Sequence, residues 1–143
     1  MPVTIAVEST VDSDELRDLY DSVGWSAYTR DIDGLTRAVA ASHLVLTARD
    51  ETGLLVGLAR TISDGETACY LPDLLVRPAQ QRHGVGRRLL TELLARYAHC
   101  RFFVLSTADE STTDGRRAQA FYRSMGLVPH AEQDMTAYAR RIG

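Results

Sequence analysis

A turn with two glycines and several arginines is the part of the sequence best suited to chemistry. The stretch VRPAQQRHGVGRRLL, residues 76–90, places Gly84 and Gly86 between a β-branched run and a run with helical spacing. The first amides of a helix have no partner within it and lie at the positive end of its dipole. Because glycines let this backbone approach a ligand closely and arginines add positive charge, the turn predicts an anion site, above all for phosphate.

Three kinds of phosphate-binding loop contain such glycines. A Walker loop requires a Gly-Lys pair, which this chain lacks. A dinucleotide-binding loop requires a third glycine at the position where Leu89 stands. The pattern that remains is P-x-x-Q-x-x-G-x-G, formed by Pro78, Gln81, Gly84 and Gly86. The alternative is a glycine-rich helix start that binds no ligand.

This pattern resembles the pyrophosphate loop of the GNAT family of N-acetyltransferases, which bind acetyl-CoA. The strand-like run YLPDLLVRP directly upstream resembles the family's fourth strand. Residues 118–127, AQAFYRSMGL, are similar to its A-x-x-F-Y-x-x-x-G-[FL] helix. One departure is Gly115, which stands where many relatives have an Asn that contacts the coenzyme. The resemblance covers nearly all the residues. It implies a single-domain α/β fold with a mixed central sheet of about six to seven strands and about four helices.

The resemblance also implies where acetyl-CoA binds. Amides between Arg82 and Arg87 would cradle the pyrophosphate, and the backbone of residues 74–76 would pair with the pantetheine arm like an added strand. The side chain of Gln81 either contacts the coenzyme or braces the loop. His83 lies inside the loop, and its side chain is expected to face solvent. The implied coenzyme-binding set is Leu74, Leu75, Val76, Gln81, Arg82, His83, Gly84, Val85, Gly86 and Arg87.

The implied reaction is direct transfer of an acetyl group to a primary amine. An alkylamine has a pKa of about 10, so at neutral pH it is mostly ammonium and cannot attack. The reaction therefore needs a base for the amine and an acid for the departing thiolate. Tyr122, the tyrosine of the F-Y motif, is the predicted acid, and a core aromatic residue is the alternative. Asp73, which interrupts the apolar run YLPDLLV, is the predicted base or amine anchor; the alternative is an aspartate that caps amides at a bulge.

The segment between the first two predicted helices overhangs the acceptor site in the family. Trp25 and Tyr28 in this segment are predicted to bind the acceptor, and attachment of the loop to the core is the alternative for Trp25. We expect a small-molecule amine as acceptor, with a protein or peptide amine as the alternative. A non-catalytic acyl-CoA-binding domain is the alternative from a different class of function.

The elements that must position these residues follow from the spacing of apolar residues. Short apolar runs predict five strands, at residues 3–8, 43–49, 54–62, 67–76 and 101–107. Helical spacing predicts four helices, at residues 13–24, 32–39, 84–98 and 118–126, with Asp12 and Asp31 as caps of the first two. The three middle strands predict an antiparallel meander, and the following strand–helix–strand order predicts a right-handed parallel crossover. Residues 25–31 are predicted to be a loop, and residues 127–142 to add a last hairpin.

Length and composition limit the remaining possibilities. The 143 residues fit one domain, so we expect a single N-acetyltransferase domain over residues 1–143. The formal net charge of −3 gives no reason to expect a nucleic acid or a membrane surface as partner. The N-terminus lacks the features of a secretory signal, so we expect a cytoplasmic protein with two reduced cysteines. Its four histidines do not cluster, so no metal site is expected. Homodimers are common in this fold, and the predicted C-terminal hairpin would offer an edge for pairing two copies.

Overall fold

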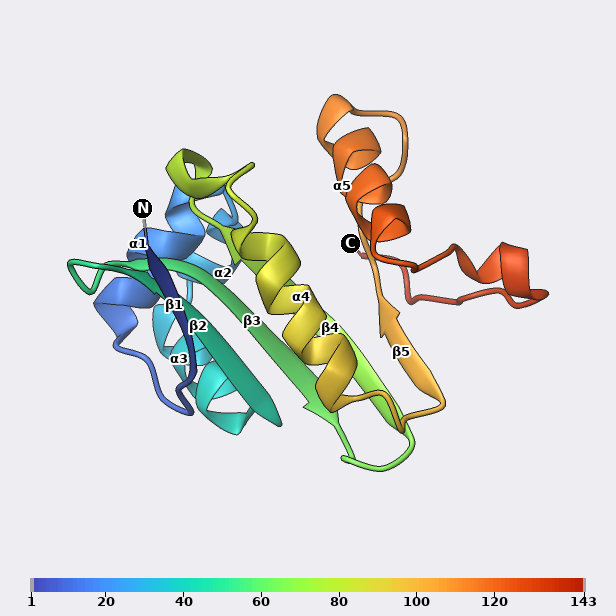
Figure 1. The fold of residues 1–143 in the computed structure, drawn as a ribbon, viewed down its shortest axis with the longest axis horizontal. Helices are drawn as coiled ribbons and strands as arrows, with labels where there is room; N and C mark the ends of the chain where they lie inside the picture. Colours follow the sequence, from blue (N-terminus) through green and yellow to red (C-terminus); the bar gives the residue numbers. More distant parts are fainter. Residues whose placement is uncertain (1, 143) are drawn as a thin grey trace. The chain divides into compact units, whose positions relative to one another are not determined.

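The computed structural model describes residues 2–142, and the chain forms two compact units, Met1–Ser106 and Thr107–Gly143. The first unit is built on one mixed sheet whose strands lie in chain order (Figure 1). Its first four strands pair antiparallel, and the fifth pairs parallel with the fourth, which confirms the predicted mixed sheet. The strands are β1 (Val3–Val7), β2 (Leu44–Asp50), β3 (Leu55–Ser63), β4 (Ala68–Val76) and β5 (Phe102–Leu105).

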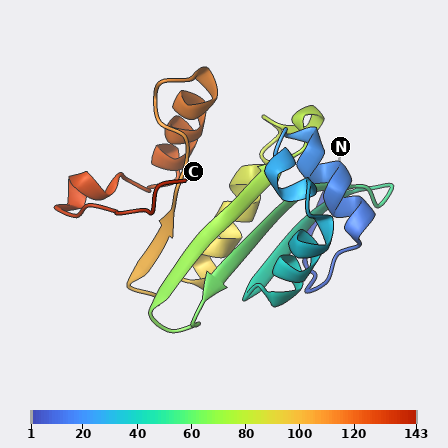
Figure 2. The same ribbon diagram turned by 180° about the vertical axis from the view of Figure 1, so that it is seen from behind.

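Helices cover both faces of this sheet. On one face lie α1 (Ser13–Ser22), α2 (Ser26–Thr29) and α3 (Ile32–Ala41), and on the other lies α4 (Val85–Arg96) (Figures 1 and 2). Helix α1 begins after Asp12, whose carboxylate accepts hydrogen bonds from the amides of Asp14 and Glu15. Buried side chains of α1, α3 and the sheet form one hydrophobic cluster, which includes Leu16, Leu19, Tyr20, Leu35, Val39, Val45, Leu55, Leu58 and Leu75.

A bulge interrupts the pairing of β3 with β4. Arg60 lies opposite Asp73, but the next registered pair is Ile62 with Tyr70. Two residues of β4, Leu71 and Pro72, therefore stand against one residue of β3. A strand alternates its side chains between two faces, so the extra residue brings Tyr70 and Asp73 to the same face.

Strands β4 and β5 stay paired over only part of their length. The last registered pair is Leu71 with Leu105, immediately before the bulge. Residues 72–76 of β4 continue beyond this point with β3 on one side. Among residues 2–142, no strand is registered against them on the other side. The sheet thus opens at the bulge and leaves one backbone edge of β4 without a partner strand.

The second unit contains one long helix, α5 (Thr113–Ser124), and a 3-10 turn, η2 (His130–Gln133). Thr112 begins α5 by accepting a hydrogen bond from the amide of Gly115 at 2.9 Å. Outside these two elements, residues 107–142 form neither a helix nor a paired strand.

The predicted numbers of strands and helices are both wrong. Residues 2–142 contain five strands, not six to seven, because the hairpin expected over residues 127–142 is absent. In its place Pro129 opens the turn η2, and Asp134 closes it in the left-handed region with a φ of 57°, which a continuous strand does not allow. The same residues contain five α-helices, not four, because α2 occupies the segment predicted as a loop.

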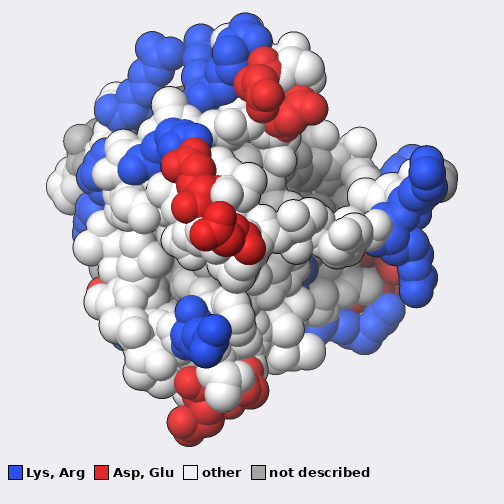
Figure 3. Space-filling model, turned by 90° about the vertical axis from the view of Figure 1, so that its right-hand side faces the viewer, with Lys and Arg blue, Asp and Glu red and all other residues white. Residues whose placement is uncertain are grey.

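The surface is chemically mixed. On the face drawn in Figure 3, charged side chains form small groups on otherwise uncharged surface, and several of these groups contain basic and acidic side chains side by side. No helix within residues 2–142 is both long and apolar enough to cross a lipid bilayer.

Candidate active site

The glycine turn joins β4 to α4 and leaves the start of that helix open. Gly84 occupies the N-cap position in the left-handed region, with a φ of 81°. Within residues 2–142, no side chain caps the first amides of α4, and a Cβ at Gly84 would meet no atom within 4 Å. Arg82 is also left-handed, with a φ of 68°, which is uncommon for a residue other than glycine. The turn therefore presents open backbone and the exposed Arg82 at the positive end of a helix.

Several side chains fix this turn in place. Gln81 donates a hydrogen bond from Nε2 to the carbonyl oxygen of Val76 at 3.0 Å, so it ties the turn to the end of β4. Arg88 donates to the carbonyl oxygen of Val3 at 2.8 Å and so links α4 to β1. The side chain of Val85 is buried, whereas that of His83 is exposed. Val85 can therefore contact a ligand at this turn only through its backbone.

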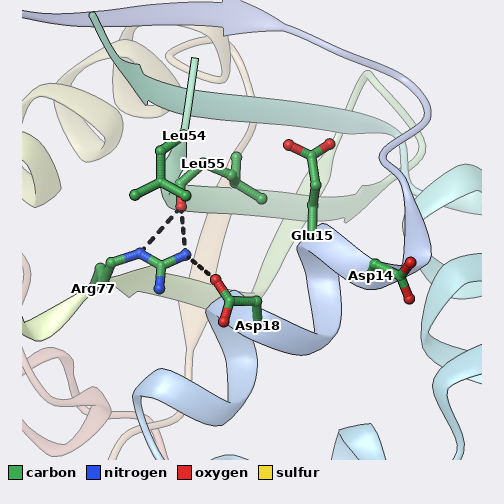
Figure 4. Close-up of a pocket in the computed structure, with 6 residues that line it drawn as sticks. All are labelled: Asp14, Glu15, Asp18, Leu54, Leu55 and Arg77. Atoms are coloured by element: carbon green, nitrogen blue, oxygen red, sulfur yellow. Dashed lines mark hydrogen bonds and ion pairs between the residues drawn. The ribbon is translucent and has the colours of Figure 1, made fainter. Parts of the chain in front are cut away.

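Arg77 links the start of the turn to β3 and α1. It donates to the carbonyl oxygen of Leu55 at 2.9 Å and to Asp18 at 2.8 Å (Figure 4). Together with neighbouring side chains it lines a cavity of about 220 Å³. The acids of this cavity are partly neutralised, since Asp18 pairs with Arg77 and Glu15 with Arg49. The lining residues are Asp14, Glu15, Asp18, Leu54, Leu55 and Arg77.

The open edge of β4 lies directly before this turn. Leu74, Leu75 and Val76 are registered with Ala59, Leu58 and Gly57 of β3. The side chain of Leu75 is buried, and those of Leu74 and Val76 are half-buried. Because their other backbone edge faces no strand, these residues can pair with an extended ligand as if it were an added strand.

Asp73 is the centre of a buried polar cluster, defined here as Asp73, Arg60, Tyr20 and Tyr28. Tyr28 donates from its hydroxyl to Oδ1 at 2.8 Å, and Tyr20 donates to Oδ2 at 2.9 Å. Arg60 also donates from Nε to Oδ2, in an ion pair. Asp73 is 1% exposed and Arg60 is 7% exposed. The predicted residues Asp73 and Tyr28 thus meet, and they do so with two residues that were not predicted.

The sequence contains a signal for Arg60, although none for Tyr20. Arg60 interrupts the apolar run LLVGLARTI much as Asp73 interrupts YLPDLLV, and adjacent strands of a meander bring such residues together. Tyr20 follows the apolar spacing of α1, so its buried hydroxyl leaves no mark on the pattern.

The cluster keeps its tyrosines protonated and its arginine charged. Burial and the negative charge of Asp73 raise the pKa of both Tyr20 and Tyr28 above that of an ordinary tyrosine. Burial opposes the charge of Arg60, but the hydrogen bond and attraction of Asp73 outweigh it and raise the Arg60 pKa. The cluster is therefore an ion pair with two neutral phenols bonded to its carboxylate.

Trp25 lies beside this cluster at the start of α2. Its ring centroid is 6.0 Å from that of Tyr20 and 6.4 Å from that of Tyr28. It remains 36% exposed. Trp25 thus contacts the aromatic residues that hold α2 and still presents part of its ring to solvent.

Tyr122 lies on α5 in the second unit. Its side chain is half-buried and packs edge-on against Phe121, with 5.2 Å between the ring centroids. Burial raises the pKa of its hydroxyl. No residue within 2–142 hydrogen-bonds to that hydroxyl, which can therefore donate to a ligand.

Gly115, the departure from the family's pattern, has a local cause in the same unit. A Cβ at this position would lie 1.8 Å from the carbonyl oxygen of Asp109. The loop before α5 therefore folds against a bare backbone, and an Asn at position 115 does not fit it.

Comparison with known proteins identifies the family. The family model described as "Acetyltransferase (GNAT) family" matches residues 10–127, which lie in both compact units. The chain belongs to the GNAT family. Its architecture is the single-domain α/β GNAT fold with a mixed sheet.

Three relatives illustrate the range of similarity. A GNAT-family acetyltransferase from Streptococcus pneumoniae is 30% identical, with a TM-score of 0.81 over 99% of this chain and 98% of that one. A protein from Gibberella zeae whose name describes an acetyltransferase is 34% identical over 82 residues, 55% of this chain. This GNAT chain matches only 42% of the length of that protein. An uncharacterized N-acetyltransferase from Porphyra purpurea is 26% identical over 88% of this chain and 71% of its own length.

The GNAT family uses acetyl-CoA, and the first unit has features that fit this coenzyme. The donor set consists of uncapped amides at the start of α4, beside Arg82, and suits a pyrophosphate. The open edge of β4 suits the amides of pantetheine. Within residues 2–142, no group of three or more His, Cys, Asp or Glu side chains is arranged to hold a metal ion.

Proposed function

We propose that this GNAT protein transfers an acetyl group from acetyl-CoA directly to a primary amine of a small molecule. The observation that carries the proposal is the place where β4 leaves β5, because it joins three features. The open edge of β4, the uncapped start of α4 and the buried cluster at Asp73 all lie within residues 71–85 or contact them. A coenzyme site and a polar site for an amine thus adjoin on one strand.

The coenzyme-binding residues are assigned by their backbone. Amides of residues 82–87 would hold the pyrophosphate, and the edge of residues 74–76 would bind the pantetheine arm. Gln81 acts as a brace of the turn, because its amide group already bonds to Val76. When bound, acetyl-CoA supplies the acetyl thioester that the amine attacks.

The acceptor end is assigned to Trp25, Tyr28 and Asp73. The half-buried Tyr28 hydroxyl, held by Asp73, provides a polar contact beside partly exposed aromatic surface. One polar point suits one amine on a compact apolar body, whereas an extended peptide needs a row of backbone partners. This supports a small-molecule acceptor over a protein or peptide amine.

Tyr122 is assigned as the acid. The amine nitrogen forms a bond to the carbonyl carbon, the carbon–sulfur bond breaks, and sulfur leaves with the electron pair. An ammonium acceptor loses two protons in all: one passes to solvent, and the other balances the proton that Tyr122 gives to sulfur. A hydroxyl with a raised pKa stays protonated at neutral pH and can perform this step.

Two measurements on the intact protein test the proposal. Acetyl-CoA at 100 times its dissociation constant should stabilise the folded state by about 2.7 kcal/mol, which thermal unfolding detects. Thiol release is then followed with a panel of small amines and with a lysine peptide. Binding with no thiol release from any amine would support the non-catalytic alternative, and release with the peptide alone would support a protein acceptor. Absence of both binding and release would contradict the proposal.

A further inference from the structure

The carboxylate of Asp73 already accepts three hydrogen bonds from the chain. Oδ1 accepts from Tyr28, and Oδ2 accepts from both Tyr20 and Arg60. At 1% exposure it has no open side toward a ligand. An amine cannot reach this carboxylate unless one of its three partners leaves, so direct proton transfer to Asp73 conflicts with the cluster.

The two tyrosines of the cluster differ in exposure. Each uses its hydroxyl proton for a bond to Asp73, at 2.9 Å for Tyr20 and 2.8 Å for Tyr28. Tyr20 is 0% exposed, whereas Tyr28 on the short helix α2 is half-buried. Tyr28 is therefore the member of the cluster through which a ligand can contact it.

A hydroxyl that donates its proton can still accept one. Because the proton of Tyr28 is committed to a carboxylate, its oxygen becomes a better acceptor through hydrogen-bond cooperativity. The raised pKa of Tyr28 keeps that proton in place at neutral pH. The oxygen is thus oriented to accept an N–H and has no free proton to offer.

We infer that Tyr28 is the residue that accepts an N–H from the acceptor amine, and that Asp73 and Arg60 are positioning residues that act through it. The inference rests on the proposed function and deepens it, because it assigns the contact with the amine N–H to the phenol oxygen of Tyr28 and not to the carboxylate of Asp73. It also gives Arg60 a part in recognition, because Arg60 neutralises Asp73 at Oδ2 while Oδ1 accepts from Tyr28.

The chain offers a matched pair of variants for the test. Tyr28→Phe and Tyr20→Phe each remove one hydroxyl from the same carboxylate, but only Tyr28 is placed to meet the amine. For Tyr28→Phe we expect the KM for the amine to rise about tenfold, the size of one neutral hydrogen bond. The KM for acetyl-CoA should not change. For Tyr20→Phe we expect a lower melting temperature with a small change in the amine KM.

The possible outcomes separate this inference from the function on which it rests. Equal rises of the amine KM in both variants, or no rise in Tyr28→Phe, would overturn the inference and leave acetyl transfer intact. Wild-type protein that releases no thiol with any amine would contradict the proposed function and, with it, this inference. Stabilisation of each variant by acetyl-CoA in a thermal melt verifies that it is folded.

Discussion

Arg60 and Asp73 lie opposite each other on β3 and β4 and form an ion pair in which both side chains are almost completely buried. Removing two charges from water is unfavourable unless each compensates the other and their remaining bonding capacity is filled. Here Tyr20 and Tyr28 fill that capacity on the carboxylate. The pair also lies beside the bulge at which β4 leaves β5. It therefore fixes the strand at the point where the coenzyme and the amine are proposed to meet.

Removing one partner of this ion pair should lower the free energy of unfolding more than removing both charges. Arg60→Met leaves an uncompensated buried carboxylate, and we expect it to lower the free energy of unfolding by roughly 3–5 kcal/mol. The double variant Arg60→Met with Asp73→Asn buries no charge and should recover part of that loss. Denaturant unfolding of the wild type and both variants measures the difference. A single variant no less stable than the double variant would contradict this account.

The buried phenol of Tyr20 should make the protein sensitive to alkali. Its pKa in the folded state is raised, so its contribution to stability is complete below the unfolded pKa of about 10. Above that pH the unfolded chain releases the proton while the folded chain keeps it. The free energy of unfolding therefore falls, by up to about 1.4 kcal/mol per pH unit. This loss should be smaller in Tyr20→Phe. Unfolding curves of the wild type and of this variant across this pH range measure the difference. Identical slopes would show that Tyr20 is not the group responsible.

Much of the fold could be predicted because its signals are local. The alternation of the meander and the glycines before α4 each depend on residues close together in the chain. The short helix α2 has only four residues, too few to establish a helical period. The hairpin predicted over residues 127–142 does not form, because the backbone at Asp134 turns left-handed instead of continuing as a strand.

The candidate site also contains residues that local sequence could predict and residues that it could not. The turn at Gly84 is a continuous motif, so its residues could be named from the sequence. The bond between Tyr28 and Asp73 joins residues 45 positions apart. Arg60 faces Asp73 only in one register of β3 against β4, and the bulge at Leu71 and Pro72 sets where that register changes. Pairing across strands, rather than composition or spacing, decides which polar residues meet.

The coenzyme loop should tolerate an added side chain better than an added negative charge. Gly84 is left-handed with open space around it, and Asn is the non-glycine residue that adopts this conformation most readily. We expect Gly84→Asn to bind acetyl-CoA with modest loss. Gly84→Asp, nearly identical in shape, should bind at least about tenfold more weakly, because its carboxylate repels the pyrophosphate. Calorimetric titration of both variants checks this. Equal affinities of the two variants for acetyl-CoA would show that the pyrophosphate does not bind at this turn.

Gly115 should be intolerant of any side chain. Gly115→Ala places a Cβ against the carbonyl oxygen of Asp109, a backbone atom that a rotamer change cannot move. We expect a loss of roughly 3 kcal/mol or more of stability, at the upper end of overpacking effects. Gly126→Ala is the control in the same unit: its φ of 87° adds strain, but its Cβ would meet nothing within 4 Å. That variant should lose about 1–2 kcal/mol. Thermal unfolding of the two variants tests the order, and equal losses would point to strain alone.

Tyr122 should contribute to turnover and little to stability. Its hydroxyl bonds to no residue within 2–142, so Tyr122→Phe leaves no described partner unsatisfied. We expect kcat to fall by about 10²-fold or more, the effect of a lost general acid, with the affinity for acetyl-CoA unchanged. Tyr97→Phe is the contrasting control, because the Tyr97 hydroxyl shares hydrogen bonds with Thr61 at 2.6 Å and His43 at 2.7 Å. That variant should lose about 1–3 kcal/mol of stability and keep its kcat. Steady-state thiol release and thermal unfolding, measured on both, separate the two roles. A Tyr122→Phe enzyme with the kcat of the wild type would assign Tyr122 to packing and leave the acid to another group.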